Sequence, residues 1–562
     1  MNKAALCFAF AVAASATMSR AANIFVAPEG RGEMTGADWS NALKGTLNGY
    51  SGVRAAINTA VAGGATEVNV YFAGGNYSIT NQMSLSSITV PVNLRGGYLA
   101  ETDGSLAKGE TATTFSRTAN NVRHLSATSM AELQIEGISF RNGLLGNTGA
   151  QRGASLSIAS SNVTITNCIF SSNKANAKSN TSSRGGAIYM DGGSLSVFQS
   201  TFSGNSTAGS NCTEYGGAIC TLNADLTVEG CTFTENFLNS SQSPTLGGAI
   251  AVNGKKAIIR RCTFDGNYAY CSQTYAGGVA TGGALAVRSA THFEMSDCTL
   301  VKNPAFYGST TATAALKSGC YFDDFNTKDG VMTAVVTRCV FDSRSMPTTY
   351  TKSKSDLLLN GGRLFMTNCL FMGAAGTDSS MTNLVRVQRI TSDKIKDLVA
   401  TSSSTPNSIC SLELVNVTIA GGKGAGAVAI GNDAAMTLKN CIVYGNTVAG
   451  VINPTTITYS CVQEPHDGVG NFVADPHWTG APYYHLLTKR AGGAITDGWF
   501  GGTYNSAKTE KNSPCLDAAA PGTPGLDLEP HPNGRHVNLG AYGGTPWASK
   551  TLSPPPTTLF AQ

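Results

Sequence analysis

The sequence predicts an all-β solenoid, a single-stranded parallel β-helix, because a pair of short motifs recurs at a regular spacing through the middle of the chain. A Gly-Gly-Ala-(Ile/Leu) motif begins at four positions, Gly185, Gly216, Gly247 and Gly282. A Phe/Leu-x-x-Asn motif follows each of them and begins at Phe202, Phe233, Phe264 and Leu300. The period is about 31 residues, and a fixed period in the range of roughly 20 to 50 residues is the signature of a repeat architecture.

Each repeat is expected to hold strands joined by turns. Residues alternate around every motif Phe, as in Asn167-Cys168-Ile169-Phe170, which is the period-two pattern of a strand with one buried face. The Gly pair predicts a bend that needs positive φ or close backbone approach, and the motif Asn predicts a second turn because Asn tolerates the left-handed region. Equivalent residues then stack one strand spacing apart, about 4.8 Å. A β-propeller or a leucine-rich horseshoe would carry Trp-Asp or Leu-x-x-Leu-x-Leu signatures, and neither recurs here.

One column of cysteines supports the same stacking. Cysteine occupies the same slot of the repeat seven times, at Cys168, Cys231, Cys262, Cys298, Cys339, Cys369 and Cys441. Cysteine behaves as a small hydrophobe in protein interiors, so we expect a buried column rather than a metal or redox site. The parallel Cβ vectors of a column fit a disulfide poorly, and the turn residues Cys212 and Cys271 are the better candidates for a bridge.

The two ends of the chain differ from the repeats. A charged start, an apolar run and small residues near position 21 predict a secretory signal peptide. A helix that starts at Ser51 and ends at Gly63-Gly64 should cover the first rung, which would otherwise expose an unpaired edge. The predicted organisation is a signal peptide at 1–22, an N-terminal helical cap with the first rungs at 23–112, the β-helix at 113–461, an irregular C-terminal cap at 462–549 and a flexible tail at 550–562.

Composition narrows the partners. Charged residues make up 13% of the 562 residues, and the net charge is +4 with scattered basic side chains, so we expect no nucleic-acid partner. No later stretch approaches the roughly 18 consecutive apolar residues of a transmembrane helix. A composition rich in hydroxyl side chains, together with the signal peptide, predicts a secreted protein, in the extracellular space or on the outer surface of a bacterial cell. The sequence does not predict the oligomeric state.

Irregular spacing marks where a groove could be built. The distance between equivalent ladder positions grows from 31 residues to as many as 48 after Cys262. Because strand length is fixed by the stack, the extra residues should be loops, and insertions in a solenoid gather on one face. The predicted loops are 303–317, 321–330, 343–355 and 373–407.

The motifs resemble those of a known family. The paired Gly-Gly-Ala-Ile and Phe-x-x-Asn signatures between about residues 150 and 305 resemble the repeats of the chlamydial polymorphic outer-membrane proteins. That resemblance implies a β-helix and adhesion at a cell surface. This chain lacks the alternating strands of a C-terminal autotransporter barrel. The opening Ile24-Phe25-Val26-Ala27-Pro28 and the closing Asn538-Leu539-Gly540-Ala541-Tyr542 are similar to segments of secreted, right-handed, pectate-lyase-like β-helix proteins, a group that includes polysaccharide lyases and glycoside hydrolases.

Candidate site residues gather in the lengthened rungs. Asp323, Asp324 and Asp329 form the best carboxylate cluster, and such a cluster can hold calcium. A lyase would also need a base, for which Arg338, Lys352 and Lys354 are the candidates. Ligand contacts are predicted at Tyr307, Tyr321, Asp323, Asp324, Arg363 and Arg386.

Two functions remain open from the sequence, beside a third interpretation as a purely structural envelope component. The first is a non-enzymatic β-helix that binds an extracellular polysaccharide or a cell-surface glycan through the loops between about 303 and 407, without a cofactor. The alternative is a polysaccharide lyase that acts on a uronate-containing polysaccharide and uses calcium. The elements that mark polygalacturonases and pectate lyases are missing, which favours binding over catalysis.

Overall fold

The structure is a computed structural model, and every structural statement below concerns the residues that it describes. These residues are 20–45, 51–101, 105–146, 149–179, 181–210, 212–241, 244–272, 280–307, 318–324, 331–345, 355–373, 383–388, 409–422, 427–430, 434–447, 450–488, 494–495, 504–505 and 512–551.

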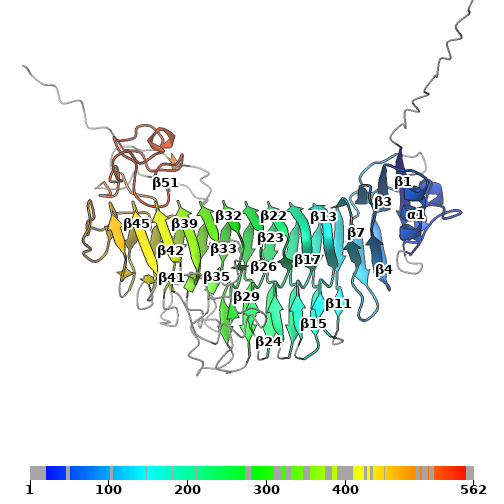
Figure 1. Ribbon diagram of the computed structural model, residues 1–562. Coiled ribbons are helices and arrows are strands. Elements are labelled where there is room, and N and C mark those ends of the chain that lie inside the picture. The colour runs from blue at the N-terminus through cyan, green and yellow to red at the C-terminus, as the bar shows by residue number, and fades with distance from the viewer. Residues whose placement is uncertain are drawn as a thin grey trace, which may run out of the picture.

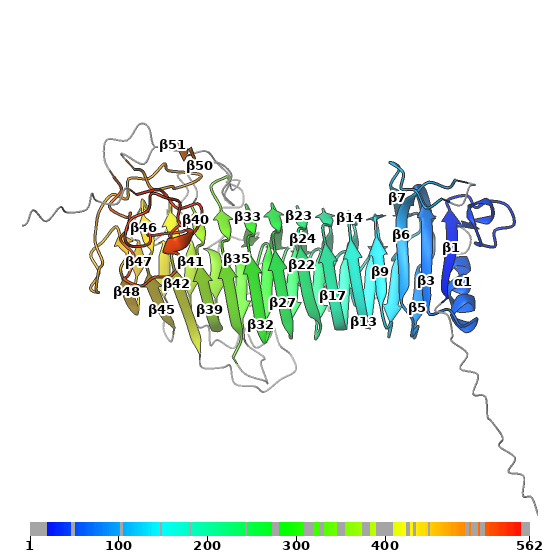
Figure 2. The same cartoon turned by 90° about the horizontal axis from the view of Figure 1, so that it is seen from above.

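The predicted fold class is confirmed. The strands run parallel in long stacked rows, so that the molecule is an elongated solenoid with α1 (Ser51–Ala62) at one end and an irregular cap at the other (Figures 1 and 2). A 25-stranded sheet forms two of its faces, which we call ladder 1 and ladder 2, and a 13-stranded sheet forms ladder 3. The long strands β13 (Leu156–Thr166) and β17 (Ile188–Phe198) contribute their first halves to ladder 1 and their second halves to ladder 2.

The remaining strands of the three ladders follow in chain order. Ladder 1 contains β5 (Met83–Ser86), β8 (Leu125–Thr128), β21 (Ile219–Leu222), β26 (Ile250–Asn253), β31 (Leu285–Arg288), β35 (Ser318–Asp323), β38 (Ser355–Leu359), β41 (Val385–Val387), β44 (Val428–Ile430) and β47 (Val451–Ile452). Ladder 2 contains β1 (Ala21–Ala27) with its partner β2 (Leu43–Lys44), β3 (Glu67–Ala73), β6 (Val92–Tyr98), β9 (Leu133–Glu136), β22 (Asp225–Glu229), β27 (Lys256–Arg260), β32 (His292–Ser296), β36 (Thr333–Thr337), β39 (Gly362–Thr367), β42 (Cys410–Val415), β45 (Ala435–Lys439) and β48 (Thr456–Thr458). Ladder 3 contains β4 (Gly75–Ile79), β7 (Thr113–Arg117), β10 (Ile138–Arg141), β14 (Ile169–Ser171), β18 (Thr201–Ser203), β23 (Thr232–Thr234), β28 (Thr263–Asp265), β33 (Thr299–Val301), β37 (Val340–Asp342), β40 (Leu370–Met372), β43 (Thr418–Ala420), β46 (Ile442–Tyr444) and β49 (Cys461–Val462).

Two further sheets form a second tier beside the stack, which we call the fin. Figure 1 shows it as the lower row of cyan and green strands. One fin sheet contains β11 (Leu144–Leu145), β15 (Lys174–Ala177), β19 (Ser206–Gly209), β24 (Phe237–Ser240), β29 (Tyr268–Cys271) and β34 (Ala305–Tyr307). The other contains β12 (Gln151–Arg152), β16 (Ser182–Arg184), β20 (Thr213–Tyr215), β25 (Thr245–Leu246) and β30 (Ala280–Thr281).

The register confirms the predicted period. Phe202 pairs with Phe233, and Phe233 pairs with Phe264 on the next rung of ladder 3. Their rings stack with centroids 4.8 and 4.9 Å apart, which is the spacing of adjacent strands. The motif Phe residues therefore form a continuous column in the core.

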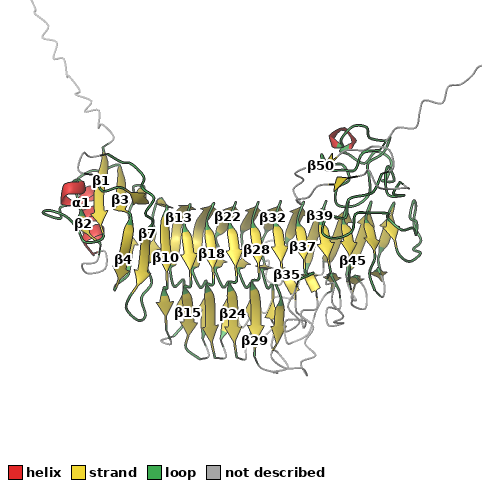
Figure 3. Cartoon of the chain, turned by 180° about the vertical axis from the view of Figure 1, so that it is seen from behind, coloured by secondary structure: helices red, strands yellow, loops and turns green. Residues whose placement is uncertain are grey.

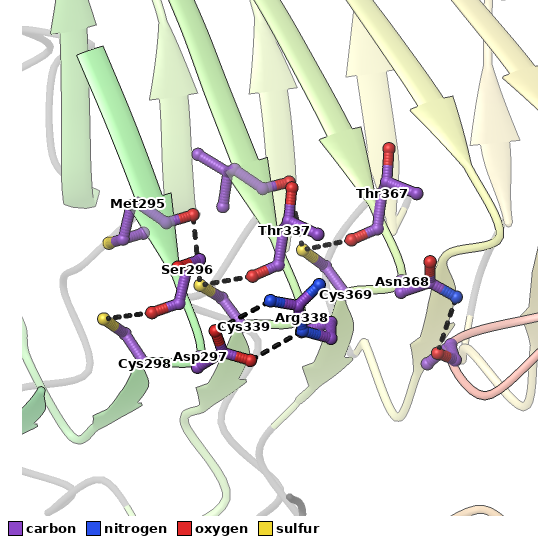
Figure 4. A network of polar contacts seen from close by, with 12 residues as sticks. Met295, Ser296, Asp297, Cys298, Thr337, Arg338, Cys339, Thr367, Asn368 and Cys369 are labelled. Carbon is purple, nitrogen blue, oxygen red and sulfur yellow. Dashed lines mark hydrogen bonds and ion pairs between the residues drawn. The ribbon is translucent and has the colours of Figure 1, made fainter. Parts of the chain in front are cut away.

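The predicted cysteine column lies at the corner between ladders 2 and 3. All seven side chains are at most 1% exposed, and each thiol donates to the carbonyl oxygen two residues before it, as Cys298 does to Ser296 and Cys339 does to Thr337 (Figure 4). The residue before the cysteine has positive φ in most rungs, for example Asn167 at 52° and Arg338 at 51°. The corner is thus a left-handed residue followed by a small buried side chain.

The Gly-Gly motif serves both purposes that the sequence predicted for it. The first glycine has positive φ, 64° at Gly185 and 61° at Gly216. The second lies against the neighbouring rung, so that a Cβ on Gly217 would be 2.1 Å from the carbonyl oxygen of Gly248. A side chain at this second position would collide with backbone atoms.

The motif Asn has a different role from the one predicted. The left-handed residue of this turn is the one before it, such as Glu235 at 53° or Gly266 at 66°. The five Asn side chains, at Asn173, Asn205, Asn236, Asn267 and Asn303, are at most 6% exposed and hydrogen-bond to one another along the stack. Asn is needed here because its amide both donates and accepts, so one side chain can satisfy backbone groups on two rungs.

Several predicted loops contain strands, which corrects the sequence reading. Residues 321–323 belong to β35, Ser355 begins β38, 385–387 form β41 and 305–307 form β34. The ladder 1 strands among these, β35, β38 and β41, were missed because their rungs lack the Gly-Gly motif that marks the start of ladder 1 in the repeats. Much of the rest of these predicted loops lies outside the described residues.

The N-terminal helix is confirmed. Val53 and Ile57 on α1 are fully buried against the first rungs, and Gly63 and Gly64 end the helix as predicted (Figure 3). β1 already begins at Ala21, two residues before the predicted first residue of the mature chain, and pairs with β3. The cleavage site itself stays a prediction, and residues 1–19 lie outside the described part of the chain.

The C-terminal cap packs on the last rungs through buried side chains. Ile442 and Cys461 of ladder 3 share a core cluster with Cys515, Val537 and Leu539 of the cap. Glu529 is 2% exposed and accepts backbone hydrogen bonds from Asn538 and Gly544, which holds the closing segment in place. Burial raises the pKa of Glu529 to about 7, with a smaller contribution from Asp517.

This shifted pKa predicts that the stability of the folded protein, with its cap docked, depends on pH. An acid whose pKa is raised by folding favours the native state at low pH, and the benefit is lost as pH rises from about 4 towards 7. Glu529→Gln should therefore remove up to about 3 kcal/mol of this pH dependence, because each unit of pKa shift is worth about 1.4 kcal/mol. Chemical unfolding of wild type and variant at pH 4.5 and pH 7.5 measures the difference. Equal pH slopes for the two proteins would show that Glu529 does not carry the effect.

The predicted bridge between Cys212 and Cys271 is absent. Both are buried, and no described cysteine forms a disulfide. Cys271 pairs in register with Ser240, and Ser240 pairs with Gly209, so the two cysteines lie on rungs that are not adjacent. The Cys212 thiol donates to the carbonyl oxygen of Lys178 instead.

Candidate functional site

A cleft lies in the corner where the six-stranded fin sheet meets ladder 3. Its volume is about 500 Å³. It spans four rungs because the turn between ladder 3 and the fin repeats along the axis. The cleft is lined by Gly204, Thr234, Glu235, Phe237, Asp265, Gly266, Tyr268, Lys302 and Pro304. We call it the fin cleft.

Two stacked aromatic rings form the apolar wall of the fin cleft. Phe237 and Tyr268 pair in register, and their ring centroids are 5.0 Å apart with planes 7° from parallel. On the preceding rung the partner of Phe237 is Ser206, so one face of the Phe237 ring meets no aromatic neighbour. Both rings are half-buried. The wall is rigid because both residues lie on short strands within a continuous ladder.

Ionisable side chains also line the cleft. Glu235 is exposed at the left-handed turn position, Asp265 ends β28, and Lys302 lies one rung further on. Two carboxylates against one ammonium leave the lining with a net charge of −1, counting only these described side chains.

The sequence carried a signal for this wall that the motif reading did not use. Phe237 and Tyr268 each follow the motif Asn directly, at the same slot of successive repeats. A large aromatic residue immediately after a turn is an unusual choice for a solvated position.

Two of the predicted residues, Tyr321 and Asp323, meet on ladder 1 together with Arg288, which was not among the predicted residues. Tyr321 donates a hydrogen bond from its hydroxyl to Asp323 Oδ2 at 2.9 Å, and Arg288 Nε lies 3.7 Å from the same oxygen. Tyr321 is fully buried, and Asp323 and Arg288 are 2% and 5% exposed. Burial raises the pKa of Tyr321 well above its usual range, so the phenol stays protonated and acts as a donor. These residues form a polar network under the surface rather than an open site.

The predicted calcium site is only partly described. Asp323 and Asp324 are both nearly buried, and Asp329 lies outside the described residues. In the described part of the chain no group of three or more His, Cys, Asp or Glu side chains is placed to hold a metal ion. Tyr321 and Arg288 compete with a cation for Asp323. The calcium role stays a prediction.

Arg338 lies at the corner between ladders 2 and 3, away from this network. Its guanidinium forms a bidentate ion pair with Asp297, with distances of 2.6 and 2.8 Å (Figure 4). The hydrogen bonds that Arg338 donates to Asp297 raise the pKa of Arg338 further. This pair works against the predicted role of Arg338 as a base, because the guanidinium must lose a proton to act as one.

The other predicted residues do not join one site. Arg363 is exposed on β39 of ladder 2, while Arg386 is half-buried on β41 of ladder 1, where burial lowers its pKa. Tyr307 ends β34 of the fin, and its side chain is not described. Lys352 and Lys354 lie outside the described residues. Their predicted roles in binding or catalysis stay predictions.

Comparison with known proteins agrees with the fold. Residues 114–315 match the family model described as a right-handed β-helix region. Among solved structures, the chain is similar to the pectate lyase Pel9A, with 10% identity, 93% of this chain and 96% of that chain covered, and a TM-score of 0.31. It is also similar to the Dettilon tailspike protein, with 12% identity, 84% and 74% covered, and a TM-score of 0.31. Tailspike protein 3 of bacteriophage CBA120 is a further likeness, with 13% identity, 76% and 62% covered, and a TM-score of 0.25.

These likenesses concern the fold and do not say what this chain binds. No match was found among curated protein sequences. Within the part of the chain that the structure describes, no helix is long and apolar enough to cross a membrane.

Proposed function

We propose that this protein is an exported, non-enzymatic β-helix that binds a glycan in the fin cleft. The observation that carries the proposal is that an aromatic wall, Phe237 and Tyr268, and polar side chains line the same cleft of about 500 Å³. Concave sites that combine an apolar wall with a few well-placed polar groups are the usual form of a small-ligand site. A sugar presents the same two kinds of surface, an apolar ring face and a rim of hydroxyl groups.

The aromatic wall suits a sugar at its open end. In a stacked ladder, the faces of the interior rings are covered by neighbouring rings, so only their edges can contact a ligand. Phe237 begins the ladder next to Ser206, so its outer face is the one surface on which a sugar ring could lie flat. Further sugars would then run along the axis past Tyr268 towards Pro304.

The charge of the lining indicates the ligand class. Glu235 and Asp265 outnumber Lys302, so a uronate would meet net repulsion in the cleft. A neutral or amino sugar is the better fit, because carboxylates accept hydrogen bonds from hydroxyl and ammonium groups. This charge favours binding over the alternative of a lyase that acts on a uronate-containing polysaccharide.

The cleft adjoins the contact region that the sequence predicted. Lys302 and Pro304 close its far end, and the predicted loop of residues 303–317 begins there. The adhesin-like role, the secreted location and the surface display belong to this proposal, as does the absence of a catalytic role.

A glycan array tests the proposal. The mature chain should bind neutral or amino-sugar oligosaccharides, and the double variant Phe237→Ala, Tyr268→Ala should weaken that binding at least about thirtyfold, the effect of losing a binding hot spot of about 2 kcal/mol. Phe365→Ala is the matched control, because Phe365 is 38% exposed on ladder 2 outside the cleft. It should bind as wild type does.

The same samples separate the alternatives. Unsaturated products from a uronate polysaccharide would favour the lyase and contradict the proposal. Binding that survives the double variant would place the site elsewhere, and the predicted loops between 303 and 407 would be the next region to trim. An absence of binding to any glycan or cell surface would leave a purely structural protein.

A further inference from the structure

Two buried thiols lie in one core cluster where the C-terminal cap closes the stack. Cys461 lies on β49, the last strand of ladder 3, and Cys515 lies in the cap segment 512–517. Both are 0% exposed, and the Cys461 thiol donates a hydrogen bond to the carbonyl oxygen of Ala474 at 3.2 Å. We call them the cap thiols.

The backbone fixes both cap thiols in position. Cys461 donates its N–H to the carbonyl oxygen of Cys441 at 2.9 Å, and its strand pairs with β46. Cys515 donates its N–H to Ser513 Oγ at 3.1 Å and accepts a hydrogen bond from the N–H of Leu539 at 2.9 Å. These backbone hydrogen bonds hold both residues in the same buried cluster.

Their geometry differs from that of the cysteine column. Column cysteines are related by the rung spacing of about 4.8 Å and point in parallel directions, whereas a disulfide needs Cβ atoms roughly 3.5 to 4.5 Å apart and a dihedral near a right angle. Cys461 and Cys515 come from segments that the rung repeat does not relate. They are therefore free of the constraint that keeps the column cysteines as thiols.

We propose that Cys461 and Cys515 form a disulfide that locks the C-terminal cap onto the last rung. The reaction needs an oxidant of the disulfide class, such as glutathione disulfide or a disulfide oxidoreductase. The Cys461 thiolate attacks one sulfur of the oxidant, forms a mixed disulfide and releases the other sulfur as a thiol. Cys515 then attacks the Cys461 sulfur and displaces the second oxidant thiol, so two thiols are oxidised and one disulfide is reduced to two thiols.

The electrostatics of the pair agree with this order of attack. The hydrogen bond from Cys515 lowers the pKa of Cys461, although burial and Asp475 act in the opposite direction. Burial raises the pKa of Cys515 well above its usual range. In the closed cap, Cys461 therefore reaches the reactive thiolate form more readily than Cys515 does. Since both thiols are inaccessible to an oxidant once the cap is closed, the mixed disulfide forms before the cap docks, and docking then brings Cys515 to it.

Peptide mapping tests the disulfide. The mature full-length chain is refolded in a glutathione redox buffer, blocked with N-ethylmaleimide in denaturant, digested without reductant and analysed by mass spectrometry. We expect a linked peptide that joins Cys461 to Cys515, with the other twelve of the fourteen described cysteines labelled. Cys461→Ser and Cys515→Ser should each abolish the linked peptide and expose one new label. Cys212→Ser, a buried cysteine outside the cap, should leave it unchanged.

Limited proteolysis gives a second readout. Oxidised wild type should resist cleavage within 512–551 at least about tenfold longer than either cap-thiol variant, because a crosslink reduces the population of the open cap. Labelling of all fourteen cysteines after oxidising refolding would overturn the proposal, as would a linked peptide between any other pair. A linked peptide without a change in cleavage rate would overturn the locking role alone.

Discussion

Gly217→Ala is expected to prevent this protein from folding to its native stack. The added Cβ would lie 2.1 Å from the carbonyl oxygen of Gly248 and 2.7 and 2.8 Å from the backbone nitrogen and oxygen of Phe237. All three contacts are backbone atoms of neighbouring strands or of the turn between them, which cannot move without disturbing the hydrogen bonds of the stack. The cost should exceed the roughly 1–3 kcal/mol of ordinary overpacking, because no side chain can rotate away.

Soluble yield and circular dichroism measure this effect. The control is Gly52→Ala on α1, where a Cβ would meet nothing within 4 Å and where Ala favours the helix. Gly52→Ala should fold as wild type does. A Gly217→Ala protein with a native β-sheet spectrum and unchanged melting would show that the rungs are not packed as closely as the structure has them.

Asn236→Ala is expected to lower the free energy needed to open its rung by at least about 4 kcal/mol. The Asn236 side chain donates to the carbonyl oxygen of Phe202 and to Asn267 Oδ1, both at 2.9 Å, and its Oδ1 accepts from the backbone N–H and the side-chain Nδ2 of Asn205. The side chain is fully buried, so Ala would leave several polar groups without a partner or water. Each such group costs about 1–3 kcal/mol.

Amide hydrogen exchange at Asn205 and its neighbours reads this local stability directly, because a solenoid can open in part without unfolding as a whole. Asn239→Ala is the matched control, since Asn239 is exposed on the same rung. It should change the exchange rates little. Similar protection in the two variants would contradict the role assigned to the Asn column.

The parts of the fold that repeat were the parts that could be predicted. The cysteine and Phe columns and the Gly-Gly bend follow from residues that recur at one slot, because stacking turns a recurring residue into a column. The role of the motif Asn could not be assigned in the same way. A recurring Asn is equally suited to a left-handed turn and to a buried amide ladder, and only the contacts of Asn236 and its equivalents distinguish the two.

The strands hidden in the predicted loops show where repetition ends. β35 and β41 carry no Gly-Gly motif, and the varied spacing around them predicts insertions. The side chain of Asp323 was therefore expected on a loop, whereas its position at the end of a strand places it beside Arg288 on the preceding rung. Contacts between rungs of unequal length depend on the register, which the spacing alone does not fix.

The candidate site was harder to predict than the fold for a related reason. The fin cleft depends on residues of ordinary type, such as Gly204 and Thr234, that become a cleft only when the fin stands against ladder 3. Phe237 and Tyr268 were the accessible signal, since both follow the motif Asn. The core cluster that holds Cys461 and Cys515 joins segments more than 50 residues apart and had no sequence signal at all.

The most direct test of the account is a crystal structure of the mature chain with the oligosaccharide that the array selects. The account predicts sugar density in the fin cleft, with one ring lying on the free face of Phe237 and hydroxyl or amino groups within hydrogen-bonding distance of Glu235 or Asp265. Sugar bound on another face of the stack, with the fin cleft empty, would contradict it.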